Sequence, residues 1–275
     1  MAIQEENFEF IRQALYQRSA IALTDNKQYL VETRLAMLAR KSGMGSVDEY
    51  VEHLKHPVSP VVWQDVVDAM TTNETSFFRD GMPFNVLRDQ IFKSVISKKG
   101  DGGILNVWSA ACSSGQEPYS IAMLWNECQA QFPGWELRII ASDISKEMLS
   151  RAELGVYTSL EIERGLSKQR REKFFHHQGD QWRINESLRK KVEFRYINLI
   201  DDWPVLPLMD VVFIRNVLVY FDLPTKQELF AKLRSAMKPD GVMFLGGAET
   251  TLTIDDQFER VFAGVGNCYR MKKVK

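Results

Sequence analysis

Cysteine is scarce in this sequence. The chain of 275 residues has three cysteines, Cys112, Cys128 and Cys268, which stand far apart with no CxxC pair among them. Structural zinc sites and disulfide frameworks use cysteines in pairs at short, regular spacings. We therefore expect neither a bound metal nor a disulfide framework, and free thiols are typical of a reducing, cytoplasmic setting.

Long apolar runs and an excess of charge are also missing. No apolar run approaches the roughly 18 residues that a membrane span needs, so we expect no membrane insertion. The first residues, MAIQEENFEF, are acidic where a secretion signal would be basic and then apolar. Lysine and arginine number 35 against 36 aspartates and glutamates, a balance that disfavours nucleic acid as a partner.

Glycine is lacking where a nucleotide-binding loop would need it. The stretch 105-LNVWSAACSSGQEPYSIAM-123 passes from apolar residues through a loop of small residues into a helical pattern. A dinucleotide fingerprint places three glycines in such a loop, but only Gly115 is present here. Glu117 follows, and a carboxylate opposes phosphate, which binds to backbone N–H groups. The loop therefore predicts a ligand without phosphate.

The rest of the sequence falls into two parts with different periodicity. Over residues 1–70 apolar residues recur at helical spacing, and Ser46 with Glu49 predicts a capping box at a helix start. From residue 100 to 275 the apolar runs LNVWSA, LRIIASDI, VEFRYINL, DVVFIRNV and GVMFLGG alternate with helical segments. This alternation predicts an α/β domain built on a parallel, doubly wound sheet.

Two segments connect or interrupt these domains. We expect residues 71–99 to form a linker that contributes to a cofactor pocket, followed by an entry turn at Gly100–Gly103. The stretch 178-QGDQWRINESLRKKVEF-194 departs from the strand-and-helix pattern, because a QGD turn is flanked by alternating residues. It predicts a small β hairpin inserted near 174–192.

Carboxylates stand at the ends of the first two predicted strands. Ligands of such sheets bind outside the carboxyl ends of the strands, where Asp143 would accept hydrogen bonds from ribose hydroxyls. An aspartate there is equally typical of an N-cap on the following helix. Glu117 favours a cationic ligand, although a glutamate in the first turn of a helix is common in itself. The nucleoside cofactor with positive charge and no phosphate is S-adenosylmethionine.

Polar residues also follow the next two predicted strands and precede the sheet. Asn198 stands in RYINLID, and Arg215 with Asn216 interrupts the apolar run VVFIRNVLVYF. A buried arginine is costly unless it is paired or functional, so we expect this pair to line a cleft. The segment 70-MTTNETSFFRDGMPF-84 is either an ordinary linker or a cover for the cofactor pocket.

Together these motifs resemble the chemotaxis receptor methyltransferase (CheR) family. MTTNETSFFRD, VWSAACSSGQEPYSIAM, ASDIS, VEFRYINL, IRNVLVYFD and KPDGVMFLGGAE occur in the family's order over residues 70 to about 250. The resemblance implies a class I (Rossmann-like) methyltransferase domain with an all-helical N-terminal receptor-docking domain and a small inserted β-subdomain. It also implies methyl transfer from S-adenosylmethionine to receptor glutamates, which gives glutamate methyl esters for sensory adaptation and S-adenosylhomocysteine, without a metal.

The resemblance also implies roles for individual residues. Arg79 and Tyr220 would flank the methyl-transfer site, and the partner would be the cytoplasmic helical bundle of a receptor. The implied cofactor contacts are Asn73, Thr75, Arg79, Glu117, Asp143, Asn198, Leu199, Arg215 and Asn216. Two features depart from the family: Cys112 replaces a smaller residue, and the insert QGDQWRINES is short. The short insert predicts an enzyme that needs no tether peptide from the receptor.

Basic residues in the helical part predict a docking surface. Lys27, Arg34 and Lys41 are spaced by seven, with Arg40 beside them, so a continuous helix would carry them on one face. The face is either solvated or binds the acidic receptor bundle. Among other activities, a nicotinamide-dependent dehydrogenase is disfavoured by the missing glycines. The alternative function is a protein that binds S-adenosylmethionine and docks receptors without turnover.

Overall fold

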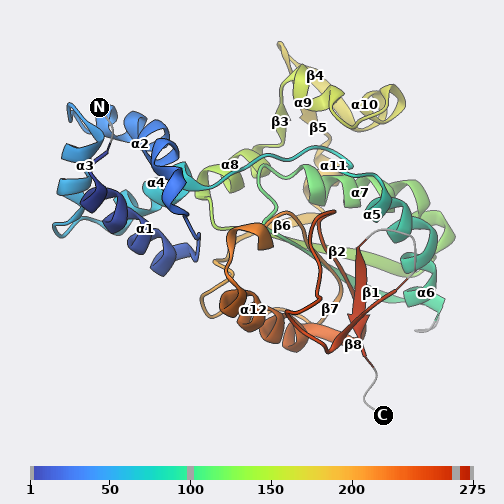
Figure 1. Ribbon diagram of the computed structural model, residues 1–275. Coiled ribbons are helices and arrows are strands. Elements are labelled where there is room, and N and C mark those ends of the chain that lie inside the picture. Colours follow the sequence, from blue (N-terminus) through green and yellow to red (C-terminus); the bar gives the residue numbers. More distant parts are fainter. Residues whose placement is uncertain (1–2, 98–101, 262–266, 273–275) are drawn as a thin grey trace.

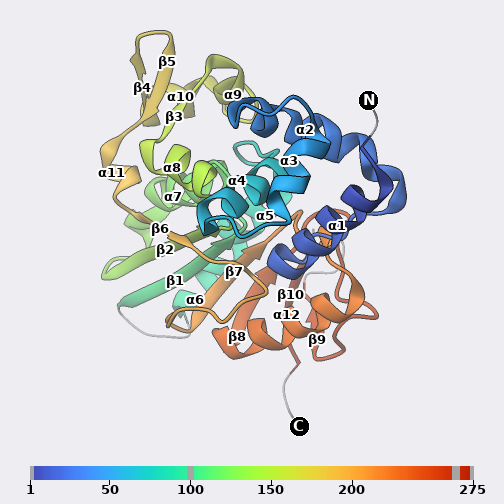
Figure 2. The same cartoon turned by 90° about the vertical axis from the view of Figure 1, so that its left-hand side faces the viewer.

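The first part of the chain is an all-helical domain, as predicted. The structure, a computed structural model, describes residues 3–97, 102–261 and 267–272. Phe8, Ile11 and Leu15 are buried together in the core of this domain, which lies beside the sheet domain (Figures 1 and 2). Its helices are α1 (Glu5–Ser19), α2 (Gln28–Lys41), α3 (Val47–Leu54) and α4 (Pro60–Met70), with a 3-10 turn, η1 (Asp25–Lys27), before α2.

Helix α3 begins where the sequence predicts, but its cap differs in detail. The Ser46 hydroxyl accepts a hydrogen bond from the Glu49 backbone N–H at 3.1 Å, as expected. The Glu49 carboxylate accepts from the Gly45 N–H at 2.8 Å instead of returning to Ser46. The predicted capping box is therefore only half formed, because the glutamate satisfies the preceding residue.

The second part is built on a seven-stranded sheet with the order β6-β2-β1-β7-β8-β10-β9. Its strands are β1 (Gly103–Ala110), β2 (Trp135–Asp143), β6 (Val192–Tyr196), β7 (Met209–Ile214), β8 (Met237–Phe244), β9 (Phe258–Arg260) and β10 (Cys268–Met271). The chain runs from β1 outward to β2 and β6 and returns to β7 on the other side of β1. This reversal of strand order places a ligand crevice at the carboxyl ends of β1 and β7.

The sheet is not entirely parallel, which corrects the prediction. Strand β10 pairs antiparallel with both β8 and β9. These last two strands in the chain have only three and four residues, so they give no periodic signal in the sequence. The predicted turn at 100–103 lies partly outside the described residues.

Helices cover both faces of the sheet, which confirms the doubly wound arrangement (Figure 1). On one face lies α12 (Leu223–Ala236), and on the other lie α7 (Gln116–Cys128) and α8 (Lys146–Leu154). Preceding the sheet are α5 (Met82–Val86), a π-helical turn η2 (Leu87–Ile91) and α6 (Phe92–Ser97). No helix within the described ranges is long and apolar enough to cross a membrane.

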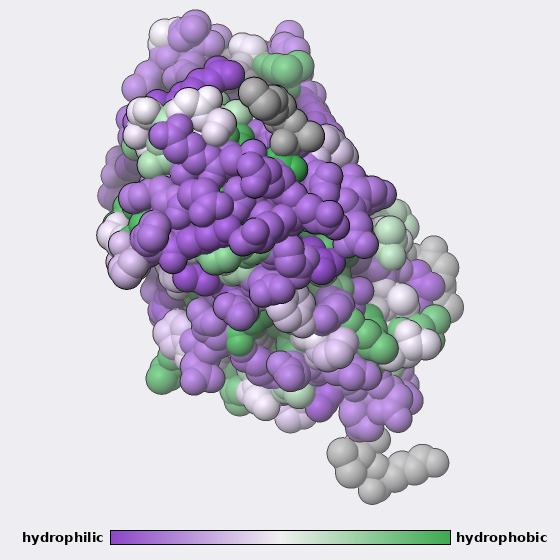
Figure 3. All heavy atoms as spheres, turned by 60° about the vertical axis from the view of Figure 1, so that its left-hand side comes forward, coloured by the Kyte–Doolittle hydropathy of each residue, from purple (hydrophilic) through white to green (hydrophobic). Residues whose placement is uncertain are grey.

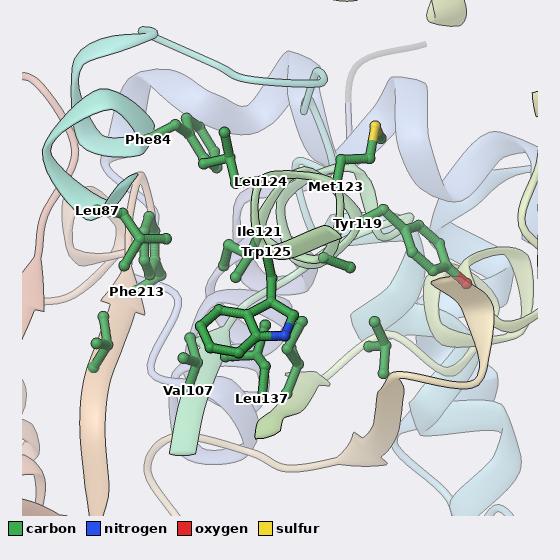
Figure 4. Close-up of a cluster of buried hydrophobic side chains, with 14 of the residues drawn as sticks. Phe84, Leu87, Val107, Tyr119, Ile121, Met123, Leu124, Trp125, Leu137 and Phe213 are labelled. Atoms are coloured by element: carbon green, nitrogen blue, oxygen red, sulfur yellow. The ribbon is translucent and has the colours of Figure 1, made fainter. Parts of the chain in front are cut away.

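Helix α7 is buried along most of its length and anchors the core. Trp125 extends from α7 toward Val107 and Leu137 on the sheet (Figure 4). The ring of Phe92 meets it edge-on, with the ring centroids 5.2 Å apart. Burying a large apolar side chain contributes about 1.5–3 kcal/mol, so this helix is held firmly against β1 and β2. Its first turn, which carries Glu117, is thereby fixed at the crevice.

The inserted subdomain is a second small sheet with the order β3-β5-β4. Strands β4 (Phe175–Gln178) and β5 (Gln181–Ile184) form the predicted hairpin, and β3 (Val156–Tyr157) adds a strand from outside the predicted range. The short helices α9 (Ser159–Glu163), α10 (Lys168–Phe174) and α11 (Glu186–Arg189) complete it. Two-residue β3 is too short to be recognised by alternation in the sequence.

The insert packs against the linker that leads into the sheet domain. The buried ring of Phe77 lies 5.0 Å from Tyr157 and 5.5 Å from Phe175, centroid to centroid. Gly165 takes a φ of +102° beneath this linker, and a Cβ there would stand 1.9 Å from the Phe77 carbonyl oxygen. The insert thus supports the same segment, residues 70–84, that the sequence places next to the cofactor pocket.

Candidate active site

A cavity opens at the carboxyl ends of β1, β2, β6 and β7, between the sheet domain and the helical domain. The helical side contributes Ser19 and Ile21, and the segment after α4 contributes residues 70–75. All ten residues predicted for cofactor binding and methyl transfer line this cavity: Asn73, Thr75, Arg79, Glu117, Asp143, Asn198, Leu199, Arg215, Asn216 and Tyr220. No cluster of His, Cys, Asp or Glu suited to a metal occurs in the parts of the chain that are described.

The loop after β1 uses its N–H groups within the protein. Cys112 donates to the Ser142 carbonyl at 2.9 Å, and Gly115 donates to the Cys112 carbonyl at 3.1 Å. The Ser113 N–H donates to the Asp143 carboxylate at 2.7 Å. A phosphate-binding loop would leave these donors free for its ligand. The geometry therefore supports the prediction of a ligand without phosphate.

Asp143 lies beneath this loop and is not a helix cap. One of its carboxylate oxygens accepts from the Ser113 N–H, and the other accepts from the Ser145 N–H at 2.8 Å. The N-cap of α8 is Ser145, whose hydroxyl accepts from the Met148 N–H at 3.2 Å. The alternative interpretation of Asp143 as an N-cap is therefore wrong. Burial raises the pKa of Asp143, and its backbone hydrogen bonds oppose the rise.

Arg215 is the centre of a buried ion-pair network. Its guanidinium donates to Glu117 at 2.9 Å and to Asp80 at 2.6 Å, and it also donates to the Arg79 carbonyl at 3.0 Å. The other Glu117 oxygen accepts from the Ser109 hydroxyl at 2.7 Å. Glu117, which the sequence suggests would favour a cationic ligand, is thus already paired with a cation of the protein. At the cavity itself the Arg215 guanidinium offsets the Glu117 carboxylate, because Asp80 is half exposed and does not line the cavity.

The donors and acceptors of this cavity suit S-adenosylmethionine. Each Asp143 oxygen retains a second lone pair, so the carboxylate is able to accept from ribose hydroxyls. The charged residues that line the cavity are Glu74, Glu117 and Asp143 against Arg79 and Arg215, and this excess of one negative charge suits the sulfonium and ammonium groups. The Nε of Arg215 is buried without a hydrogen-bond partner among the described residues, and such a donor suits an acceptor on a ligand.

Several predicted residues are engaged with the protein as well as the cavity. Arg79 donates to the Glu74 carbonyl at 2.7 Å, which holds its side chain beside the linker. The Asn198 amide donates to the Arg18 carbonyl at 2.7 Å, a contact with the helical domain. The Leu199 carbonyl accepts from the Lys232 ammonium at 3.0 Å. These contacts connect the walls of the cavity to the linker, to the helical domain and to α12.

Tyr220 lies in a 3-10 turn, η4 (Leu218–Tyr220), at the edge of the cavity. Its backbone carbonyl accepts from the Ala22 N–H of the helical domain at 3.0 Å. Its hydroxyl has no hydrogen-bond partner among the described residues, so it is available to a substrate. Its role at the methyl-transfer site stays a prediction.

The predicted basic stripe does not form, because Arg34 is turned inward. Its guanidinium donates to the carbonyls of Met70 at 2.7 Å and Thr71 at 2.8 Å, and to the Thr72 hydroxyl at 2.9 Å. Lys27 lies in η1, before α2 begins, and so is not on the same helix. Only Arg40 and Lys41 remain exposed at the end of α2.

Other residues in these networks were not identified from the sequence. Asp80 is adjacent to Arg79 but pairs with Arg215, which is far away in the chain, so spacing gives no signal for the contact. Ser109 belongs to an apolar strand and looks like a packing residue. Glu249 lies in the last recognised motif, and its carboxylate accepts from the Asn216 N–H at 2.8 Å.

Two family models match this chain in succession. The model for the CheR methyltransferase all-alpha domain matches residues 6–71. The model for the CheR methyltransferase SAM binding domain matches residues 73–266. Together they cover most of the chain, and S-adenosylmethionine is therefore its cofactor.

Curated relatives agree over nearly the whole length. A chemotaxis protein methyltransferase of Pseudomonas putida is 40% identical over 97% of this chain and 98% of its own. A chemotaxis protein methyltransferase of Pseudomonas aeruginosa is 39% identical over 99% of this chain and 100% of its own. Among solved structures, a TehB-like SAM-dependent methyltransferase from Corynebacterium glutamicum is 10% identical to this chain, with a TM-score of 0.39. The match covers 70% of this chain and 97% of the other. On the family models and curated relatives, this chain belongs to the CheR family of chemotaxis protein methyltransferases.

Proposed function

We propose that this enzyme methylates glutamate side chains in the cytoplasmic helical bundle of chemotaxis receptors and forms methyl esters. The observation that carries the proposal is the cavity at the domain junction, where Arg79 and Tyr220 stand beside the residues suited to S-adenosylmethionine. The names of the relatives connect their methylation to chemotaxis. A receptor carboxylate is the substrate that this site suits best.

The chemistry needs no general base. Bound S-adenosylmethionine supplies an electrophilic methyl group on its sulfonium and leaves as S-adenosylhomocysteine. A glutamate has a pKa of about 4.3, so its carboxylate is already ionised near neutral pH. One carboxylate oxygen would bond to this methyl carbon as the carbon–sulfur bond breaks, and the electron pair of that bond would stay on sulfur. The enzyme therefore acts by orientation and by exclusion of water.

Arg79 and Tyr220 are suited to orient the carboxylate. The Tyr220 hydroxyl is unengaged, and the Arg79 guanidinium is only partly satisfied by the Glu74 carbonyl. A hydrogen bond from either one fixes the carboxylate without removing its second oxygen from reaction. A tight bidentate ion pair would instead reduce its nucleophilicity, so we propose that Arg79 holds only one oxygen.

The receptor docks on the helical domain in this proposal. The side of the molecule toward the helical domain is predominantly hydrophilic (Figure 3). Arg40 and Lys41 are exposed at the C-terminal end of α2, where they suit the acidic surface of a receptor bundle. Exposed pairs of this kind contribute about 0.2–1 kcal/mol each, so they select a partner rather than hold it tightly.

We also propose that no receptor tether is needed. Strands β4 and β5 are joined by a turn of only two residues, Gly179 and Asp180. Such a short hairpin offers little surface beyond its own strand edges. Recognition then depends on the helical domain and on the cavity itself.

The test is transfer of a radiolabelled methyl group from S-adenosylmethionine to receptor-containing membranes. We expect base-labile label on the receptor, at an equal rate when the C-terminal segment of the receptor is removed. A receptor whose candidate glutamates are replaced by glutamine is the matched control and should take up no label. Cofactor binding without labelling would identify a docking protein without turnover. A rate that collapses on removing the receptor C-terminus would refute tether independence alone.

A further inference from the structure

We propose that Glu249 is a positioning residue for methyl transfer, an inference that rests on the proposed function. Glu249 follows β8 and is 5% exposed. It does not line the cavity, so any effect on the reaction passes through its neighbours. Those neighbours are the backbone of the loop after β7, which carries both Asn216 and Tyr220 into the cavity.

The Glu249 carboxylate accepts three backbone hydrogen bonds. One oxygen accepts from the Gly246 N–H at 2.7 Å and from the Asn216 N–H at 2.8 Å. The other oxygen accepts from the Leu218 N–H at 2.8 Å. Buried N–H groups require such partners, and these three have no helix or strand partner. A single side chain thus provides the hydrogen-bond acceptors for backbone N–H groups of two loops.

The loop after β8 and the loop after β7 are in close contact at Glu249. Asn216 has a left-handed φ of +60°, a conformation that asparagine adopts more readily than most other residues with a side chain. At Gly246 a Cβ would stand 2.7 Å from the Glu249 carboxylate and 2.9 Å from the Asn216 nitrogen. The Asn267 amide, directly before β10, donates to the carbonyls of Gly246 and Glu249 and so holds the loop after β8 in place. The Glu249 carboxylate therefore joins Asn216 to a loop that is itself held in place.

The hydrogen bond to Leu218 leads directly to the reacting end of the cavity. Leu218 is the first residue of η4, and Tyr220 is the last. Because the turn has only three residues, a shift of its first N–H moves Tyr220 with it. Misplacement of a positioning group by about 1 Å is able to lower a rate by about a hundredfold.

Glu249→Gln is the discriminating variant because it preserves shape while removing one acceptor. The remaining carbonyl oxygen keeps its bonds to Gly246 and Asn216, and the amide NH₂ then faces the Leu218 N–H as a second donor. The Leu218 end of the loop is released, whereas the Asn216 end is kept. We expect kcat for receptor methylation to fall at least about tenfold, with the Kd for S-adenosylmethionine changed less than about threefold, as positioning rather than binding predicts.

Asp210→Asn is the matched control. Asp210 is a buried carboxylate at the opposite end of β7, where it accepts from the Asn106 N–H at 2.9 Å and the Lys238 ammonium at 2.8 Å. Both variants should lower the unfolding temperature, but only Glu249→Gln should lower kcat. Hydrogen–deuterium exchange should rise in a peptide covering 216–220 for Glu249→Gln and stay unchanged for Asp210→Asn.

A double-mutant cycle with Tyr220→Phe decides whether the effect passes through Tyr220. If it does, Glu249→Gln costs much less in the Tyr220→Phe background than in the parent, because the positioned hydroxyl is already absent. Equal kcat for parent and Glu249→Gln, or a fully additive cycle, would overturn the inference. Receptor labelling by the parent enzyme is measured first. If the parent does not label the receptor, the proposed function is refuted, but the role of Glu249 is not. The exchange measurement remains interpretable in either case.

Discussion

Replacing Arg34 by alanine should weaken cofactor binding although Arg34 belongs to the helical domain. Its guanidinium makes three hydrogen bonds to the stretch Met70–Thr72, and these residues line the cavity. The two carbonyls stand at the end of α4, where backbone acceptors have no partner within the helix. Arg34 therefore caps the C-terminal end of α4 and also fixes the start of the linker.

The magnitude follows from the number of bonds and their exposure. Hydrogen bonds to a charged group contribute about 1.5–3 kcal/mol each when buried. Arg34 is partly exposed, so water replaces much of the loss. We expect the binding free energy of S-adenosylmethionine to weaken by about 1–2 kcal/mol, which corresponds to a Kd raised about 5–30-fold.

The assay is calorimetric titration of S-adenosylmethionine into the parent and the variants. Arg40→Ala is the matched control, because Arg40 lies on the same helix and its side chain has no hydrogen bond or ion pair with a described residue. Arg34→Lys should be intermediate, since an ammonium cannot reproduce the planar arrangement of donors. If Arg34→Ala and Arg40→Ala bind the cofactor equally well, the coupling between α2 and the cavity is refuted.

Four further predictions address the cavity and the docking surface. Asp143→Ala should weaken S-adenosylmethionine and S-adenosylhomocysteine alike, by about 1–3 kcal/mol in calorimetry. Because burial raises the pKa of Asp143, parent affinity should decline on acidification from a higher pH than for an ordinary aspartate, as the carboxylate becomes neutral; a pH-independent Kd would contradict this. Tyr220→Phe should lower methylation kcat with cofactor Kd kept, and unchanged turnover would make the hydroxyl a bystander. Reversing Arg40 and Lys41 to Glu should raise the receptor KM at low salt only, since exposed charges are screened beyond about 8 Å at physiological salt. If the KM is unchanged at low salt, the two residues belong to a solvated helix face and do not bind the receptor.

The positions at the strand ends could be predicted from the sequence because a parallel sheet aligns them. Asp143, Asn198 and Arg215 follow three separate apolar runs, and adjacent parallel strands bring their carboxyl ends to one edge. A short apolar run marks its own end in the sequence. That is why residues far apart in the chain could be placed around one crevice.

The pairing of charges could not be predicted in the same way. Arg215 and Asp80 are 135 residues apart in the chain, and no periodicity relates them. Arg34 has the same difficulty, since its spacing from Lys41 indicates a common helix face but not the direction of a long side chain. A flexible arginine reaches either solvent or a neighbouring carbonyl, and only the tertiary arrangement of α4 decides between them.

The junction between the domains explains why these side chains are used internally. The Arg18 carbonyl accepts from Asn198, the Ala22 N–H donates to the Tyr220 carbonyl, and the Gln64 amide donates to the Ile144 carbonyl. Each contact joins the helical domain to a loop at the cavity. These hydrogen bonds fix the helical domain against the walls of the cavity. A mutation meant to test the proposed docking surface without disturbing the cavity therefore requires residues such as Arg40 that take no part in the junction.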